Sequence, residues 1–201
     1  MALNFANNNS LSAITSLPAS ISGGAFTLLQ TQTASSSSTI SFTSNIDSTY
    51  DAYMFKFYNV HPSSDSNEFQ VNFSTDGGSN YNVTKTTTIF EAYHKEDGTN
   101  GTLSYAGSDD LAQSTSFQPI TRSIGNADDE SASGTLILYS PSNTTFVKHF
   151  IATTNAYIYS DYTFNEFIAG YCNTTSAING VQFKMASNNI DSGVIKLYGI
   201  S

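Results

Sequence analysis

Apolar and polar residues alternate with a period of two along much of the chain after residue 25. The clearest example is the segment 69–73, Phe-Gln-Val-Asn-Phe, in which every second side chain is apolar. Successive side chains of a β-strand point to opposite faces, so this pattern predicts a half-buried strand. The denser run 50–60 has apolar residues on both faces and predicts a central strand covered on both sides. One face carries Tyr53, Phe55 and Phe57, and the other carries Met54, Tyr58 and Val60.

Shorter strand signals recur between turn residues over the rest of the chain. Strands are predicted at 26–33, 38–43, 81–89, 117–124, 134–140, 145–153, 156–160, 166–172, 180–185 and 193–200. The run 34–38 consists of small residues and predicts a turn. Together these segments give about eleven to twelve strands and no amphipathic helix, which is typical of a sandwich. We therefore predict an all-β fold, a jelly-roll-like β-sandwich with an extended N-terminal arm.

Two segments are predicted to be turns or loops with particular roles. Residues 74–81 follow the pattern Ser-x-Asp-x-Gly-x-x-aromatic, which resembles the Asp-box turn of sialidases and other β proteins. That resemblance implies a structural turn, in which Ser74 and Asp76 bond the backbone and Tyr81 packs beneath, and here it predicts a hairpin. The segment 93–110 is rich in Gly, Asn and Asp and predicts a long surface loop of the kind that often carries binding.

Residues 1–23 have a different character from the domain predicted for residues 24–201. Apolar residues are widely spaced among Asn and Ser there, without the period of a helix or a strand. We expect an extended arm, or a short helix that ends at Pro18, which docks onto another subunit, while a disordered leader is the alternative. The docking side chains would be Leu3, Phe5, Leu11, Ile14 and Leu17. Removal of residues 1–23 is then expected to leave a folded domain that no longer joins an assembly.

The composition narrows the choice of partners. Of the 201 residues only 11% are charged, and 16 acidic residues outnumber 7 basic ones to give a formal net charge of −9. Solubility must therefore rest on hydroxyl and amide groups. The few scattered basic residues form no stripe that would neutralise phosphates, so neither nucleic acid nor an anionic membrane surface is an expected partner.

Three further features of the sequence concern membrane insertion, export and disulfide formation. No run of about 18 apolar residues is present to span a bilayer, and the first residues lack the basic and apolar regions of a signal peptide, which predicts synthesis in a cytoplasm. The single cysteine, Cys172, follows the apolar run 167–171 and can form no internal disulfide. We interpret it as a small buried apolar residue and not as a nucleophile.

Catalytic and metal-binding chemistry finds little support in the residue spacing. Acidic residues adjoin one another at 109–110 and at 128–130, where calcium binding or a pair of glycosidase carboxylates is the alternative to a solvated surface. The histidines His61, His94 and His149 lie in no zinc-type spacing, although a three-fold axis could bring copies of one histidine together. We predict no enzyme activity, no cofactor and no metal.

Tyrosines are the more suggestive side chains. Tyr157, Tyr159, Tyr162 and Tyr171 stand among Asn, Ser and Asp residues. They either form a platform on which sugar rings stack, or divide between the core and a subunit interface. With residues of the 93–110 loop, the candidate glycan or subunit contacts are Tyr93, His94, Tyr105, Tyr157, Tyr159 and Tyr162.

Four segments carry a resemblance to a known class of proteins. They are the runs 26–34, 46–53, 74–78 and 192–200, and they resemble small virion proteins of tailed bacteriophages, particularly marine ones, over residues 25 to 201. The resemblance does not separate head decoration from tail fibre, and it transfers no functional residue to this chain.

The resemblance implies a structural protein on the surface of a virion, assembled in the host cytoplasm. The expected function is that of a capsid decoration (cement) protein or a tail-fibre component. Its partners would be other virion proteins and further copies of itself, arranged as a trimer, because self-association protects sheet edges that few lysines guard. The alternative is a carbohydrate-binding adhesin that recognises a host surface glycan, and a depolymerase is a distant third.

Overall fold

A computed structural model describes residues 26–201 and contains twelve β-strands and no helix in that range. The strands are β1 (Thr27–Ser37), β2 (Ile40–Phe42), β3 (Ala52–Pro62), β4 (Asn67–Ser74), β5 (Lys85–Lys95), β6 (Gly101–Tyr105), β7 (Gln118–Ile124), β8 (Ala132–Tyr139), β9 (Lys148–Ile158), β10 (Tyr162–Cys172), β11 (Gly180–Met185) and β12 (Ile190–Ile200). The all-β prediction is confirmed. The predicted arm, with its five docking residues, lies outside the described residues.

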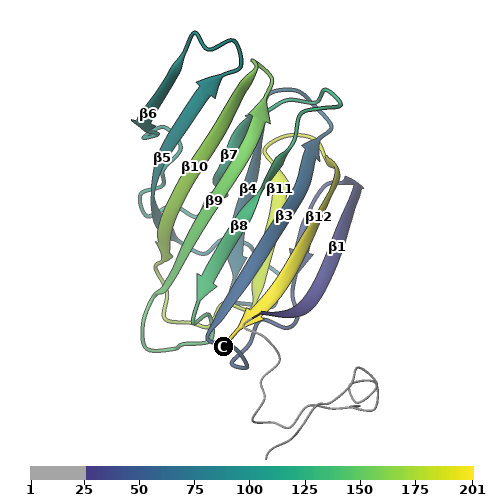
Figure 1. The fold of residues 1–201 in the computed structure, drawn as a ribbon. Coiled ribbons are helices and arrows are strands. Elements are labelled where there is room, and N and C mark those ends of the chain that lie inside the picture. Colours follow the sequence, from purple (N-terminus) through teal and green to yellow (C-terminus); the bar gives the residue numbers. More distant parts are fainter. Residues whose placement is uncertain (1–25) are drawn as a thin grey trace, which may run out of the picture.

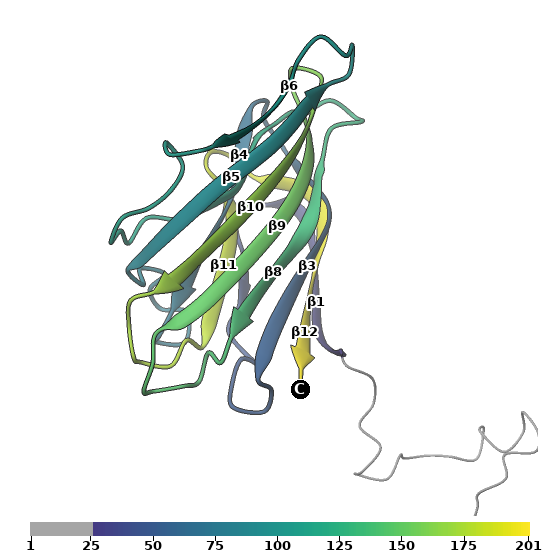
Figure 2. The same cartoon turned by 60° about the vertical axis from the view of Figure 1, so that its left-hand side comes forward.

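The strands form two facing layers, and every strand pair is antiparallel (Figures 1 and 2). The broad layer has the order β6-β5-β10-β9-β8-β3-β12-β1, and the narrow layer has the order β7-β4-β11-β2. A single ladder pair, Ile124 with Ile158, joins the two layers at one side. The result is a sandwich that is nearly closed into a barrel.

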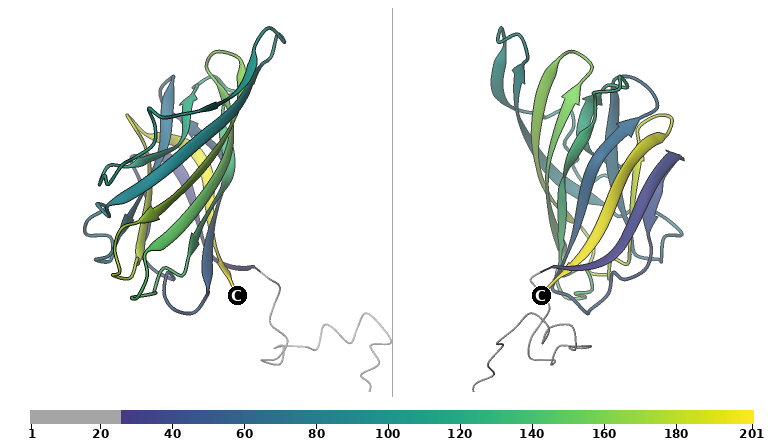
Figure 3. Two further views of the ribbon diagram at one scale, coloured as in Figure 1. Left: turned by 90° about the vertical axis from the view of Figure 1, so that its left-hand side faces the viewer. Right: turned by 45° about the vertical axis from the view of Figure 1, so that its right-hand side comes forward.

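The connections give this sandwich its jelly-roll-like nesting. Strand β3 pairs with the last strand, β12, in the broad layer, and the next strand, β4, pairs with the penultimate strand, β11, in the narrow layer. Because the broad layer has more strands, its β5–β6 hairpin projects past the rest of the sandwich (Figure 3, left).

Aromatic rings fill the space between the layers. Phe183 of β11 lies at the centre, with ring centroids 5.2 to 6.2 Å from those of four other phenylalanines, and its side chain is fully buried. The partners are Phe42, Phe55, Phe57 and Phe69. Aromatic pairs of this kind stabilise a fold by about 0.5–1.5 kcal/mol beyond their area burial. Phenylalanine supplies most of the core rings, whereas Tyr53 is the only buried tyrosine among residues 26–201.

Several predicted boundaries were wrong in instructive ways. The segments 145–153 and 156–160 form one strand, β9, because Asn155 continues the alternation with its side chain outside, where its Nδ2 donates to the Phe164 carbonyl at 3.0 Å. The run 34–38 does not turn, since β1 continues to Ser37. The predicted loop 93–110 contains the end of β5 and all of β6, whose pairing makes a hairpin.

The turn at residues 74–81 has the predicted bonding but joins different layers. Ser74 Oγ accepts hydrogen bonds from the backbone N–H groups of Asp76 (3.2 Å) and Gly78 (3.0 Å). Gly78 has a φ of +89°, and a Cβ atom there would lie 2.7 Å from the Tyr81 hydroxyl, so the tyrosine does pack beneath the turn. However, β4 pairs with β7 and β11 and not with β5. The prediction of a hairpin was wrong, and the turn is a crossing between layers.

Candidate functional site

The outer face of the broad layer carries three rows of side chains that run across the strands in register. Inward positions in the same strands are buried, for example Phe55, Leu136 and Ile168. We call these outward rows the broad face. The first row consists of Leu28, Tyr198, Met54, Ile137, Ile151, Ala169 and Thr88, and the second consists of Thr31, Lys196, Lys56, Thr135, Thr153, Phe167, Phe90 and Tyr105. The third row consists of Ser133, Asn155, Asn165, Ala92 and Leu103.

The broad face is unusually apolar for a surface. Ile151 is 48% exposed, Phe90 is 46% exposed, and Leu103 is 69% exposed. Phe90 and Phe167 stack with ring centroids 4.7 Å apart. An antiparallel sheet that meets solvent on one side normally carries polar side chains there, and an exposed apolar patch on a protein marks an interaction surface. Sequence reasoning missed this face because it expected the second side of the sheet to be covered.

The prediction that run 50–60 is covered on both sides was therefore wrong in part. Strand β3 is central, between β12 and β8, and its inner face is buried. On its other side, Met54 of the broad face is only 9% exposed, whereas Tyr58, which lies beside the three rows, is 41% exposed. Val60 is buried because the pairing with β8 shifts between Phe57 and Val60, at a bulge that contains Asn59 with a φ of +48°, and this bulge reverses the alternation.

The charges on the broad face all have one sign. Its three rows contain Lys56 and Lys196 and none of the chain's 16 acidic residues. The ammonium group of Lys56 lies 5.6 Å from the centroid of the Tyr198 ring, and that of Lys196 lies 5.4 Å from the Tyr58 ring. In a chain with a net charge of −9, such a surface repels a second acidic molecule less than the remainder of the chain does.

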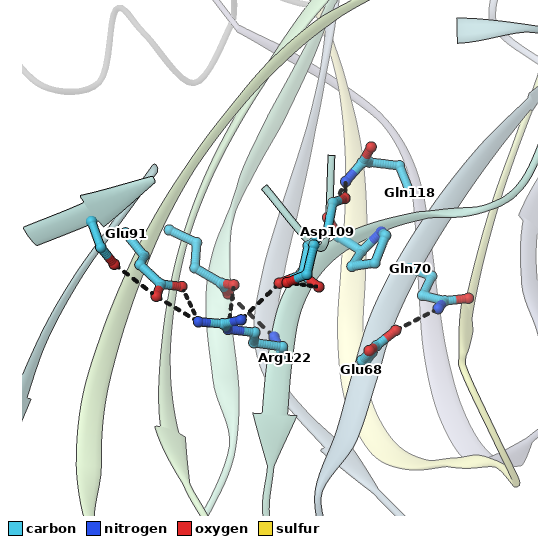
Figure 4. Close-up of polar contacts among 10 residues, drawn as sticks. Glu68, Gln70, Glu91, Asp109, Gln118 and Arg122 are labelled. Carbon is cyan, nitrogen blue, oxygen red and sulfur yellow. Dashed lines mark hydrogen bonds and ion pairs between the residues drawn. The ribbon is translucent and has the colours of Figure 1, made fainter. Parts of the chain in front are cut away.

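A network of ion pairs lies between the two layers, around Arg122 of β7. Its Nη1 donates to Asp109 Oδ2 at 2.8 Å, and its Nη2 contacts both carboxylate oxygens of Glu91 at 2.5 Å. Glu166 of β10 accepts a hydrogen bond from the Arg122 backbone N–H at 3.2 Å. Figure 4 shows Arg122 extended between Glu91 and Asp109. The network thus joins both layers and the 106–117 loop.

Three carboxyl groups share this one guanidinium, and two of them are strongly buried. Glu91 and Glu166 are 3% and 4% exposed, respectively. Burial raises the pKa of Glu166 to about 8, against the attraction of Arg122, and the neighbouring carboxylates of Glu91 and Asp109 act in the same direction as burial. Sequence reasoning missed this network, although Glu91 and Glu166 each interrupt an apolar inward face, which was the available signal.

A small cleft of about 230 Å³ opens beside this network, between β5, β10 and the ends of β7 and β9. Tyr93 stacks on Phe164 with centroids 4.8 Å apart, and Tyr162 meets Tyr93 edge to face at 5.7 Å. The Arg122 guanidinium lies 5.5 Å from the Phe164 ring centroid. The complete lining is Glu91, Tyr93, Asn100, Arg122, Ile158, Ser160, Tyr162 and Phe164.

The structure brings only two of the predicted contact residues together in this cleft, namely Tyr93 and Tyr162. Tyr157 lies on the outer side of β9 and donates to Glu96 Oε2 at 2.9 Å, and this hydrogen bond raises its pKa to about 12. Tyr159 is half exposed in the β9–β10 turn, and Tyr171 stands at the far end of β10, beside His149. His94 is exposed next to Gly101, and Tyr105 belongs to the broad face. The predicted tyrosines therefore form no single platform.

The acidic pairs and the histidines have separate surroundings. Asp109 pairs with Arg122, Asp110 accepts a hydrogen bond from the Tyr105 hydroxyl, and Glu130 accepts one from the Ala127 N–H at 2.7 Å. His61 contacts the Ala127 carbonyl at 3.1 Å. Among residues 26–201, no group of three or more His, Cys, Asp or Glu side chains is placed to hold a metal ion.

Cys172 is fully buried with a free thiol, as predicted. It is the register partner of Lys85 on β5 and of Lys148 on β9, so two buried lysines flank it. Burial raises the pKa of the Cys172 thiol to about 12 and lowers the pKa of Lys85 to about 8. Lys85 Nζ donates to the carbonyls of Ser116 (2.6 Å) and Val83 (3.1 Å), which holds the chain beside β5. We therefore interpret Cys172 and its two neighbouring lysines as residues that stabilise the fold.

Comparison of the chain with protein-family models, with curated proteins and with solved structures gives no match. In the described part of the chain, no helix has the length and apolar character needed to cross a membrane. Function must therefore be argued from the broad face and the cleft.

Proposed function

We propose that this chain is a non-enzymatic structural protein of the virion surface, a capsid decoration protein or a tail-fibre component, which assembles through its broad face. The observation that carries the proposal is that this face presents exposed large apolar side chains, and that its three rows contain two lysines and no acidic residue in an otherwise acidic chain, with Asp110 only at the edge beside Tyr105. The resemblance to phage virion proteins points in the same direction. The site of assembly would be the host cytoplasm, and the final location the virion.

The occupant of the broad face that the charges favour is a second copy of the chain. Two copies with a net charge of −9 each repel one another, and this repulsion is least where acidic residues are missing from the contact. A two-fold contact centred on Lys56 and Lys196 would bring like charges together. A head-to-tail contact instead lets these lysines meet the acidic surface of the next copy, and such contacts form a ring when the rotation between successive copies closes. We therefore propose a trimer with head-to-tail contacts, which then docks onto other virion proteins.

The test is the mass of the full chain in solution, measured by sedimentation for the wild type and three variants. Thr153→Glu places a carboxylate at the centre of the broad face, Thr153→Gln places a neutral side chain of the same size there, and Gln182→Glu adds the same charge on the narrow layer. The wild type is expected to have three times the 21.6 kDa of one chain. Thr153→Glu should weaken association at least tenfold more than either control does.

A monomeric wild type, or equal association of the Thr153→Glu and Gln182→Glu variants, would refute the proposed interface. Thermal unfolding of each variant shows whether a loss of association reflects a loss of fold.

The cleft supports a second candidate function, that of an adhesin for a host surface glycan. The supporting observation is that Tyr93 and Tyr162, both among the residues proposed for glycan contact, line a cleft together with Asn100 and Ser160. Aromatic rings combined with hydroxyl and amide groups suit sugar recognition. A glycan array probed with the full chain tests this function, and a flat response across host polysaccharides would count against it.

A further inference from the structure

Two adjoining recesses lie on the outer side of the broad layer, at the end where β8 and β10 stop. They have volumes of about 560 and about 490 Å³, and His149 lines both of them. Tyr139 and His149 are the next outward positions after the register partners Ile137 and Ile151, and Tyr171 pairs with His149. We call the two recesses together the end groove, and its main walls are Tyr139, Phe146, His149, Ile151, Ala169 and Tyr171.

Hydrogen bonds hold the walls of the end groove in place. Phe146, in the loop between β8 and β9, is 69% exposed. Asn143 Oδ1 accepts hydrogen bonds from the backbone N–H groups of Thr145 (2.7 Å) and Phe146 (2.8 Å), which fixes this loop. At the other side of the groove, Gln113 Nε2 donates to the Tyr171 hydroxyl at 3.2 Å. The groove therefore presents aromatic and apolar side chains from a fixed frame.

The charge of the end groove restricts its occupant. None of the described residues that line either recess is Asp, Glu, Lys or Arg. A charged side chain brought into such a groove loses its hydration without gaining a partner. All 16 acidic and 7 basic residues of the chain follow residue 25, so the segment 1–25 has no charged side chain. That segment contains the side chains predicted to dock, namely Leu3, Phe5, Leu11, Ile14 and Leu17. Its composition therefore matches that of the groove.

The place where this segment joins the described residues lies within reach of the groove. The ammonium group of Lys56, on the broad face, lies 5.7 Å from the centroid of the Phe26 ring, so the chain enters the fold on the side of that face. A row of register partners leads from Thr27, the first residue of β1, to Phe150, which borders the groove. The row crosses four strand spacings, about 19 Å, whereas 25 extended residues span up to about 80 Å. The segment can therefore reach the groove of its own chain or of a neighbouring copy.

We infer that the end groove binds residues 1–25 of the neighbouring copy, whose apolar side chains pack beside Phe146 and over Ala169. The inference rests on the proposed assembly and names the contact that each copy makes with the next. Ile151 and Ala169 belong both to the groove and to the broad face, so the groove opens toward the copy that covers this face. A segment of the same chain lying there would hold the two copies apart, whereas the segment of the neighbour adds to their contact.

Photo-cross-linking of the full chain tests this contact. A light copy carries benzoylphenylalanine in place of Phe5, an unsubstituted copy is labelled with heavy nitrogen, and the two are unfolded and refolded together. Mass spectrometry then identifies the peptides that irradiation joins. We expect cross-links from the light segment to heavy peptides that contain residues 139–149 or 169–175. Cross-links to light peptides alone would mean that the segment docks on its own chain, and would overturn the inference.

Two substitutions of Phe146 in the heavy copy test the groove itself. The side chain is 69% exposed, so neither substitution removes a core residue. Phe146→Asp places a charge among the apolar walls and should lower the yield of light-to-heavy cross-links at least tenfold, whereas Phe146→Leu should keep most of it. Equal yields from these two variants would overturn the inference.

Sedimentation of the same samples separates this inference from the proposed function. A trimeric wild type whose cross-links avoid the end groove would overturn the inference alone. A monomeric wild type would refute the proposed assembly as well.

Discussion

The ionisable side chains buried between the layers control how the stability of this protein depends on pH. Glu166 ionises with a pKa of about 8 in the folded chain, against an ordinary value of 4.5, because burial disfavours its charged form. The folded state therefore holds a proton that the unfolded state releases between these two pH values. Stability from this group is complete below pH 4.5 and is lost as the pH rises through 8.

The first prediction concerns this carboxyl group. Between pH 4.5 and 8, we expect the free energy of unfolding of the wild type to fall by up to about 1.4 kcal/mol per pH unit through Glu166. Glu166→Gln cannot ionise, so the difference in stability between the variant and the wild type should increase over this range. Urea unfolding at a series of pH values measures it. A difference that does not change with pH would show that Glu166 ionises normally.

Lys85 gives the second prediction, with the opposite sign. Burial lowers its pKa from 10.5 to about 8, so its contribution to stability falls as the pH falls through 8 and recovers as the pH rises. The stability of the wild type should therefore pass through a minimum near pH 8 and rise between pH 8 and 9. Above pH 9 the raised pKa of Cys172 acts in the opposite direction. Burial also lowers the pKa of Lys148, which adds to the rise. Lys85→Met should therefore make the rising limb shallower in the same urea experiment, and an unchanged slope in this variant would contradict the assignment.

At the residue scale, the sequence located single buried groups better than it located their partners. Cys172 was correctly expected to be buried, because it follows an apolar run. Arg122 was not expected to hold three carboxyl groups, because its partners lie 13 to 44 residues away in sequence. Pairing across strands, which the local pattern does not encode, brings such groups together.

Among the elements, the turn between β4 and β5 shows how a local motif fixes backbone geometry. The buried Ser74 hydroxyl donates to Asp76 Oδ1 at 2.7 Å and accepts from two backbone N–H groups. The bonds that Asp76 receives from Asn80 and Ser74 lower its pKa to about 2. The motif was readable from sequence because its residues are contiguous. The strand that follows it was wrongly predicted to pair with β4, because the motif fixes the turn and not the pairing of the strands.

The third prediction tests this turn. Ser74→Ala leaves the backbone N–H groups of Asp76 and Gly78 without their acceptor, so we expect a loss of about 1–3 kcal/mol in the free energy of unfolding. Thr75→Ala, at the neighbouring exposed position, should change stability by less than about 0.5 kcal/mol. Chemical denaturation of the two variants provides the comparison. Equal effects would mean that the hydroxyl of Ser74 does not hold the turn.

For the whole molecule, the period-two pattern was sufficient for the fold class but not for the surface. Alternation identified most of the strands, and phenylalanines supply most of the rings in the core, whereas Tyr53 is the only buried tyrosine among residues 26–201. The same alternation could not show that apolar residues such as Ile151 and Phe167 lie outside, because a strand with two apolar faces is the same in sequence whether its second face meets another layer or solvent. The broad face became visible only when the number of strands in each layer was known.

The central claim is that the broad face is buried in the assembled protein, and side-chain footprinting tests it most directly. Hydroxyl radicals label exposed aromatic rings, and the labelling of Phe90, Phe167 and Tyr105 can be compared between the assembled wild type and the Thr153→Glu variant. We predict that these three rings are protected in the wild type and labelled in the variant, while Tyr159, half exposed outside this face, is labelled equally in both. Equal labelling of the three rings in both proteins would contradict the claim.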